Sequence, residues 1–123
     1  MVHWNLLIFA FLSSLILELQ NNYYQDIREE KKIQELVNNV KPDIVFHMAA
    51  QPLVRYSYNN PIETYEVNVI GTVNVLEAAR SCSNLRAIIN VTSDKCYESN
   101  YSLKGFKETD KLGGKDPYLS LIH

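Results

Sequence analysis

Two short apolar runs constrain the fold of this chain more than any other feature of its sequence. The first covers residues 43–48 (DIVFHM) and follows Pro42, and the second covers residues 86–92 (RAIINVT). Short runs without strict polar alternation are typical of parallel strands that are buried on both faces. We therefore expect both runs to be strands of one parallel sheet.

An amphipathic helix is predicted before the first run. Its single apolar stripe has the i, i+3, i+4, i+7 spacing and consists of Ile33, Leu36, Val37 and Val40. The charged residues 29–32 begin this helix, and residues 38–39 (NN) and Pro42 end it.

A second helix is expected between the two runs, beginning at residues 59–61 (NNP). Asn60 can cap it, Pro61 suits its first position, and Glu63 completes the spacing of a capping box. We expect its buried face to include these apolar residues: Ile62, Tyr65, Val69, Val73 and Leu76. Strand, helix and strand in this order predict a right-handed βαβ unit and an α/β fold.

The N-terminal stretch has a different character. Residues 6–19 (LLIFAFLSSLILEL) are almost entirely apolar but fall short of the roughly 20 residues that a membrane helix needs. The first seventeen residues contain no Lys or Arg, and no A-x-A-like cleavage site follows. We favour a buried strand or helix, or sequence foreign to the domain, over a signal peptide or membrane anchor. Residues 1–22 are therefore separated from a domain at residues 23–123, and a cytoplasmic protein is expected.

Composition excludes several classes of function. Twelve basic and 14 acidic residues give a net charge of −2, which argues against nucleic acid or an anionic membrane as a partner. Cys82 and Cys96 are too few for a disulfide framework, and we expect both to be reduced. No Cys or His cluster has the spacing of metal ligands, so no metal site is expected. His47 is interpreted as a packed core residue, because it stands alone within an apolar run.

Candidate binding residues follow the two predicted strands. Ligands of open α/β sheets bind beyond the carboxyl ends of the strands, where residues 49–52 (AAQP) and 93–95 (SDK) are expected. Small alanines allow a ribose or phosphate to approach the backbone. The hydroxyl, carboxylate and ammonium groups of the tripeptide offer proton donors and acceptors. On spacing alone, a solvated polar turn explains the tripeptide equally well.

Two segments resemble the extended short-chain dehydrogenase/reductase family, and within it the CDP-glucose 4,6-dehydratases. They are residues 42–80 (PDIVFHMAAQPLVRYSYNNPIETYEVNVIGTVNVLEAAR) and residues 90–97 (NVTSDKCY). The resemblance extends over residues 24–118. It implies a partial Rossmann-like, doubly wound parallel sheet, NAD as cofactor and a nucleotide sugar as substrate. The implied reaction removes water from the sugar and leaves a 4-keto-6-deoxy sugar nucleotide.

The resemblance also implies contacts with NAD. Two residues would flank adenine, three would line the dinucleotide, and one would lie between nicotinamide and sugar: Asp26 and Ile27, then Met48, Ala49 and Ala50, then Gln51. Asn68 matches an asparagine of the family that is mostly structural.

Four catalytic residues are implied in the same way: Ser93, Asp94, Lys95 and Tyr118. Ser93 would hydrogen-bond the C4 oxygen, and Tyr118 as a phenolate would take the C4 proton. Asp94 would protonate the departing C6 hydroxyl, and neutral Lys95 would act as base at C5; burial favours both uncharged forms. On the alternative interpretation, Lys95 is a surface lysine paired with Asp94.

Two features depart from the family pattern. Ile122 replaces the lysine that normally follows the catalytic tyrosine by four residues, so Tyr118 lacks the cation that favours its phenolate. No glycine precedes Gly71, so the glycine-rich turn that holds the pyrophosphate of NAD is expected to be absent.

These departures predict an interior part of a longer dehydratase. We expect impaired activity, and exposed apolar faces that favour a homo-oligomer or aggregation. A noncatalytic remnant serving as an interaction module, or another nucleotide-sugar dehydratase or epimerase, are the alternatives.

Overall fold

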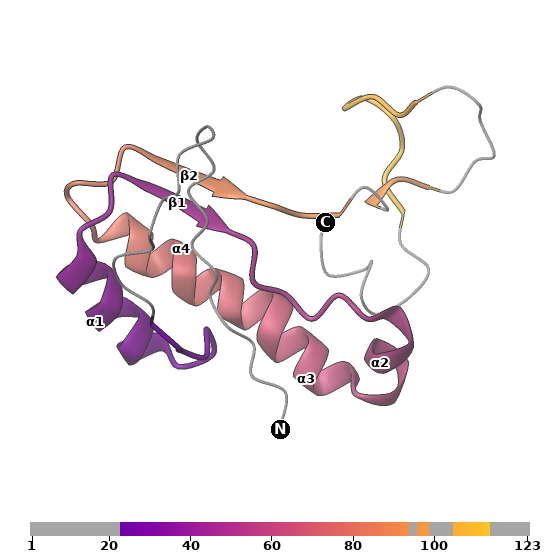
Figure 1. Ribbon diagram of the computed structural model, residues 1–123. Coiled ribbons are helices and arrows are strands. Elements are labelled where there is room, and N and C mark those ends of the chain that lie inside the picture. Colours follow the sequence, from indigo (N-terminus) through magenta and orange to yellow (C-terminus); the bar gives the residue numbers. More distant parts are fainter. Residues whose placement is uncertain (1–22, 94–95, 99–104, 114–123) are drawn as a thin grey trace, which may run out of the picture.

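The computed structural model describes residues 23–93, 96–98 and 105–113 (Figure 1). Its elements are, in chain order, α1 (Glu30–Val40), β1 (Ile44–His47), α2 (Val54–Asn59), α3 (Pro61–Tyr65), the π-helix η1 (Glu66–Gly71), α4 (Thr72–Arg80) and β2 (Ala87–Asn90). The predicted strands and helices are present, and the α/β order is confirmed. No helix within the described ranges is long and apolar enough to cross a membrane.

β1 and β2 form the predicted parallel pair. Ile44 lies opposite Ala87, and His47 lies opposite Asn90. The pairing continues beyond the strands, because the amide of Val91 donates to the carbonyl of His47 over 2.9 Å. Both strands therefore end at the same level of the sheet.

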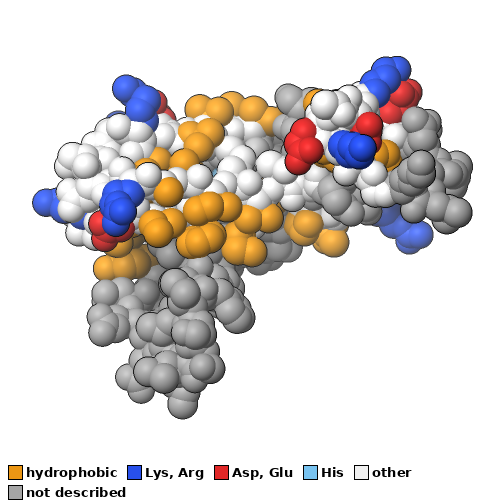
Figure 2. Space-filling model, turned by 90° about the horizontal axis from the view of Figure 1, so that it is seen from above, with side chains coloured by type: hydrophobic (Ala, Val, Ile, Leu, Met, Phe, Trp, Pro, Cys, Tyr) orange, Lys and Arg blue, Asp and Glu red, His pale blue; other side chains and the backbone are white. Residues whose placement is uncertain are grey.

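The helices lie on one face of the two strands, and the described residues place no helix over the other face (Figure 1). Ile44 and Ile89 are 48% and 40% exposed. Seen from the strand side, hydrophobic side chains gather across the middle of the molecule (Figure 2). The expected burial of the strands on both faces is therefore not found in the described part of the chain.

The first helix is present as predicted, but its apolar stripe is buried only in part, since Val40 is 42% exposed. α1 packs against α4 and buries Ile33 and Val37 in the core. It ends at Val40, where Lys41 takes the left-handed conformation with φ of 49° and donates its backbone N–H to the carbonyl of Val37 over 2.8 Å.

The second helix begins at Pro61, as predicted, but the predicted capping box is wrong. Asn60 makes no capping hydrogen bond with its side chain. Glu63 instead accepts a hydrogen bond from the Tyr56 hydroxyl and lies 3.7 Å from the guanidinium of Arg28. The Glu63 carboxylate is therefore used between structural elements rather than at the start of its own helix.

The prediction for the buried face of this helix is also wrong. Ile62 and Leu76, at the two ends of the predicted stripe, are 75% and 40% exposed. The buried residues are small or polar: Thr64, Val67, Gly71, Asn74, Val75, Ala78 and Ala79. Small side chains let the helix approach its neighbours closely, and the polar ones find hydrogen-bond partners there.

The closest approach occurs at Gly71. A Cβ atom added to Gly71 would lie 2.5 Å from Cδ1 of Ile27, which is fully buried. The φ angle of Gly71 is −58°, so space rather than backbone conformation requires glycine here. Asn74 donates to the carbonyl of Ile27 over 2.9 Å and completes this contact.

Two segments pair after β2. Tyr97 and Leu112 form an isolated antiparallel bridge, and the amide of Glu98 donates to the carbonyl of Lys111 over 2.8 Å. The ring of Tyr97 stacks on Phe106 with centroids 4.8 Å apart. Residues 105–113 are thereby held beside the segment that continues from β2.

Candidate functional site

The carboxyl ends of the two strands bring the predicted binding segments together. Residues 48–51 leave β1 at this end of the sheet, and residues 91–93 leave β2 at the same end. Met48 is 50% exposed, and Ala49, Ala50 and Ser93 are half-buried. Small side chains at the carboxyl end of a parallel sheet are suited to a ligand that approaches the backbone.

Asn68 of η1 holds the backbone of Gln51. Its Oδ1 accepts a hydrogen bond from the Gln51 amide over 2.7 Å, and its Nδ2 donates to the Gln51 carbonyl over 3.1 Å. One side chain thus satisfies both backbone groups of a residue that lies beyond the strand. The strand-end segment is therefore anchored to the helix.

The side chain of Gln51 is fully buried, and both of its polar atoms have partners. Nε2 donates to Thr64 Oγ1 over 3.0 Å, and Oε1 accepts from the amide of Leu53. In this conformation the side chain anchors the strand end to α3. Its position between nicotinamide and sugar stays a prediction.

His47 connects the end of β1 to the same helix. It is 1% exposed, which confirms the interpretation as a packed core residue, and its Nε2 lies 3.0 Å from Thr72 Oγ1. Thr72 Oγ1 donates in turn to the carbonyl of Asn68 over 2.7 Å. Burial lowers the pKa of His47 below its ordinary value of 6.5, so the ring is neutral at about pH 7.

Thr64, Asn68 and Thr72, which we call the polar ladder, are spaced four residues apart along the helix. They contact the side chain of Gln51, the backbone of Gln51 and the ring of His47 in turn. Thr64 and Thr72 were not predicted as residues of the site, and Asn68 was expected to be mostly structural. The four-residue polar spacing was the available signal, since residues at i and i+4 share a helix face.

The predicted adenine-binding residues lie in the turn before α1. The carboxylate of Asp26 accepts hydrogen bonds from Arg28 at 2.6 Å (Nη2) and 3.0 Å (Nε). This pairing, mainly through its hydrogen bonds, raises the pKa of Arg28. The side chain of Ile27 is fully buried, so a nucleotide can reach Ile27 only through its main chain.

Of the predicted catalytic residues, the structure describes Ser93, which follows β2 by three residues and is half-buried. Asp94, Lys95 and Tyr118 lie outside the described residues. The catalytic roles of all four stay predictions.

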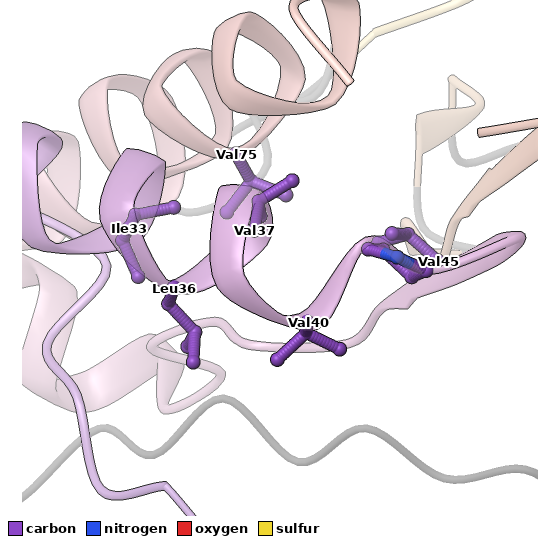
Figure 3. A pocket seen from close by; sticks show the side chains of 7 residues that line it. Ile33, Leu36, Val37, Val40, Val45 and Val75 are labelled. Atoms are coloured by element: carbon purple, nitrogen blue, oxygen red, sulfur yellow. The ribbon is translucent and has the colours of Figure 1, made fainter. Parts of the chain in front are cut away.

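A small apolar cavity of about 20 Å³ lies between α1, β1 and α4 (Figure 3). It is lined by Ile33, Leu36, Val37, Val40, Pro42, Val45 and Val75. Because no polar side chain lines it, this cavity is a packing feature and not a site for a polar ligand. The described ranges contain no group of three His, Cys, Asp or Glu side chains placed to hold a metal ion.

Comparison with known proteins identifies the family to which this α/β fold belongs. A family model described as GDP-mannose 4,6 dehydratase matches residues 16–120. The chain belongs to this family. The matched range of this dehydratase family member includes both strands, the polar ladder and every predicted site residue. The predicted family relationship is confirmed.

Curated relatives include both dehydratases and epimerases. CDP-glucose 4,6-dehydratase from Salmonella typhimurium is 48% identical over 101 residues, which cover 82% of this chain and 28% of that protein. CDP-paratose 2-epimerase from Salmonella typhi is 32% identical over 108 residues, covering 76% of this chain and 32% of that protein. The chain therefore spans less than one third of the length of these relatives.

Solved structures confirm the predicted Rossmann-like fold class. UDP-glucose 4-epimerase from Thermus thermophilus, in complex with NAD, has a TM-score of 0.73 and 27% identity, covering 81% of this chain and 32% of that chain. Pal from Bacillus thuringiensis has a TM-score of 0.79 and 25% identity, covering 86% of this chain and 33% of that chain.

Proposed function

We propose that this chain takes part in the NAD-dependent dehydration of CDP-glucose to CDP-4-keto-6-deoxyglucose in the cytoplasm, with residues 23–123 as part of the NAD-binding domain. The 48% identity to a CDP-glucose 4,6-dehydratase over 101 residues carries this proposal. The anchored strand end supports it, because parallel sheets bind dinucleotides at this position.

The residues at the strand ends fit a dinucleotide. Ala49 and Ala50 present only methyl groups, and Asn68 occupies both backbone groups of Gln51, so the end of the segment is already anchored to the helix without a ligand. The Asp26 carboxylate can accept a hydrogen bond from an adenine amine or a ribose hydroxyl. Residues 26 and 48–50 would hold NAD, which when bound accepts a hydride from the sugar and later returns it.

Four side chains of this protein would bind the sugar oxygen or transfer protons in the proposed reaction. Ser93 would hydrogen-bond the C4 oxygen of the sugar while Tyr118 takes the C4 hydroxyl proton. A C4 ketone makes the C5 proton acidic, and neutral Lys95 would remove it. Asp94 would protonate the C6 hydroxyl, which then leaves as water, and Lys95 would return the proton to C5 when the hydride returns to C6.

Binding and turnover measurements on the 123-residue chain test this proposal. Calorimetric titration should show NAD binding that weakens in Asp26→Asn. Incubation with NAD and CDP-glucose should give little 4-keto product, because the chain spans 28% of the relative's length. Any product should disappear in Asp94→Asn and persist in the control Asp43→Asn, since exposed Asp43 lies at the opposite end of β1.

Two alternatives predict different results. A noncatalytic remnant that serves as an interaction module would bind neither NAD nor nucleotide sugar. A dehydratase or epimerase of another nucleotide sugar would act on UDP-glucose or GDP-mannose in preference to CDP-glucose. Either result would contradict the proposed function and support the corresponding alternative.

A further inference from the structure

His47 is buried, yet one of its ring nitrogens lacks a hydrogen-bond partner among the described residues. Nε2 lies 3.0 Å from Thr72 Oγ1, whereas Nδ1 is buried without a partner. Buried polar atoms in proteins are nearly always paired, so a buried ring with one unpaired nitrogen calls for an explanation. The hydrogen bond at Nε2 explains why Nδ1 has no partner.

The contacts of Thr72 fix the position of the ring proton. The Thr72 hydroxyl has a single proton, and Oγ1 lies 2.7 Å from the carbonyl of Asn68, which can only accept. This proton is therefore directed to Asn68, and Oγ1 accepts the hydrogen bond from His47. The neutral ring must then carry its proton on Nε2 and leave Nδ1 bare.

We propose that His47 is a positioning residue: as the Nε2–H tautomer it orients Thr72 and, through Asn68, holds the backbone of Gln51 at the strand end. The backbone of His47 is held in the sheet, because His47 is paired with Asn90 of β2. Thr72 bonds the main-chain carbonyl of Asn68, and the side chain of Asn68 holds Gln51, so His47 fixes the helix backbone from which Asn68 reaches the strand end. The expected consequence for NAD binding rests on the proposed function.

Nitrogen NMR of the 123-residue chain tests the tautomer. The chain has three histidines, His3, His47 and His123, and loss of one signal in His47→Gln assigns the buried ring. We expect Nε2 to show the protonated, pyrrole-type signal and Nδ1 the unprotonated, pyridine-type signal. A ring protonated on Nδ1 instead would overturn the proposed chain of hydrogen bonds.

Amide exchange tests the positioning role without any nucleotide. In His47→Leu, the Gln51 amide should exchange about tenfold faster relative to the amides of α1, since linked residues couple in this range. His47→Gln retains a donor near the position of Nε2 and should restore most of the protection. Val45→Ala removes volume from the same covered face of β1 and should leave the ratio unchanged. Equal ratios in all variants would refute the positioning role.

Nucleotide affinity separates this inference from the proposed function. His47→Leu should weaken NAD binding about tenfold, an effect of the same coupling, and His47→Gln should weaken it far less. If the unaltered chain binds no NAD, the proposed function fails while the exchange ratio still decides the role of His47. If His47→Leu does not fold, Thr72→Val serves in its place, because it removes the hydroxyl that links His47 to Asn68. The Gln51 amide should then exchange faster in Thr72→Val. Unchanged exchange at Gln51 would count against the inference.

Discussion

The side-chain amide of Asn68 pairs with both backbone groups of Gln51, at 2.7 Å from Oδ1 to the amide nitrogen and 3.1 Å from Nδ2 to the carbonyl oxygen. In a sheet, a neighbouring strand provides such a pair of hydrogen bonds. Here a helix provides it, so the strand-end segment is held in place from the helix side.

Asn68→Asp should destabilise the fold by about 1–3 kcal/mol, because the carboxylate cannot donate to the Gln51 carbonyl and leaves that buried acceptor unpaired. Urea denaturation measures the change. Asn84→Ala, in an exposed turn, is the matched control and should change stability by less than about 0.5 kcal/mol. Equal stability of Asn68→Asp and the unaltered chain would show that the amide pair contributes nothing.

Gly71→Ala should destabilise the chain by about 1–3 kcal/mol, although alanine favours helices over glycine, because the new methyl group meets Ile27. Gly105→Ala is the control, since nothing lies within 4 Å of an added Cβ there. Thermal unfolding measures both variants. Combining Gly71→Ala with Ile27→Ala should cost less than the sum of the two single changes, and strict additivity would contradict the contact.

Stability should decrease as the pH falls below 6.5, the ordinary pKa of histidine. Burial lowers the pKa of folded His47, so the unfolded chain binds a proton at this residue first as the pH falls. The contribution of neutral His47 is complete above 6.5 and is lost between that value and the lower folded pKa. Urea denaturation at about pH 7.5 and about pH 5.5 should therefore show a larger loss in the unaltered chain than in His47→Gln. An equal loss in both would mean that other groups cause the pH dependence.

Self-association is expected from the apolar side chains that the helix leaves exposed. Four apolar side chains of α3 and α4 are exposed: Ile62, Tyr65, Val73 and Leu76. Tyr65→Lys should shift sedimentation towards smaller species, whereas Tyr58→Lys, exposed on α2, should not. A monomer at every concentration, unfolding cooperatively, would contradict this expectation.

The strands and α1 could be predicted from their local patterns, although the expected burial of both strand faces is not found in the described residues. Ile33 and Val37 are both apolar and buried, and the run at residues 43–48 has the length and the flanking proline that favour a strand. The buried face of the second helix could not be predicted in this way. Its largest apolar side chains lie outside the core of the described part, while Gly71 and Ala78 pack inside it.

The hydrogen-bonded site was only partly predictable. Residues 49–52 follow β1 at the carboxyl end of the sheet, as predicted from the position at which ligands of parallel sheets bind. The polar ladder runs from α3 through η1 to α4, and no local pattern of this chain indicates the π-helix η1.

The four-residue spacing of the polar ladder has a consequence for how this region can vary in length. Thr64, Asn68 and Thr72 meet Gln51 and His47 through hydrogen bonds at three positions, so a substitution at one position removes one contact and loosens its neighbours without shifting the others along the helix. Inserting or deleting a single residue between Thr64 and Thr72 would rotate the helix by about 100° and displace part of the set at once. Point changes should therefore be far better tolerated in this helix than changes in residue number.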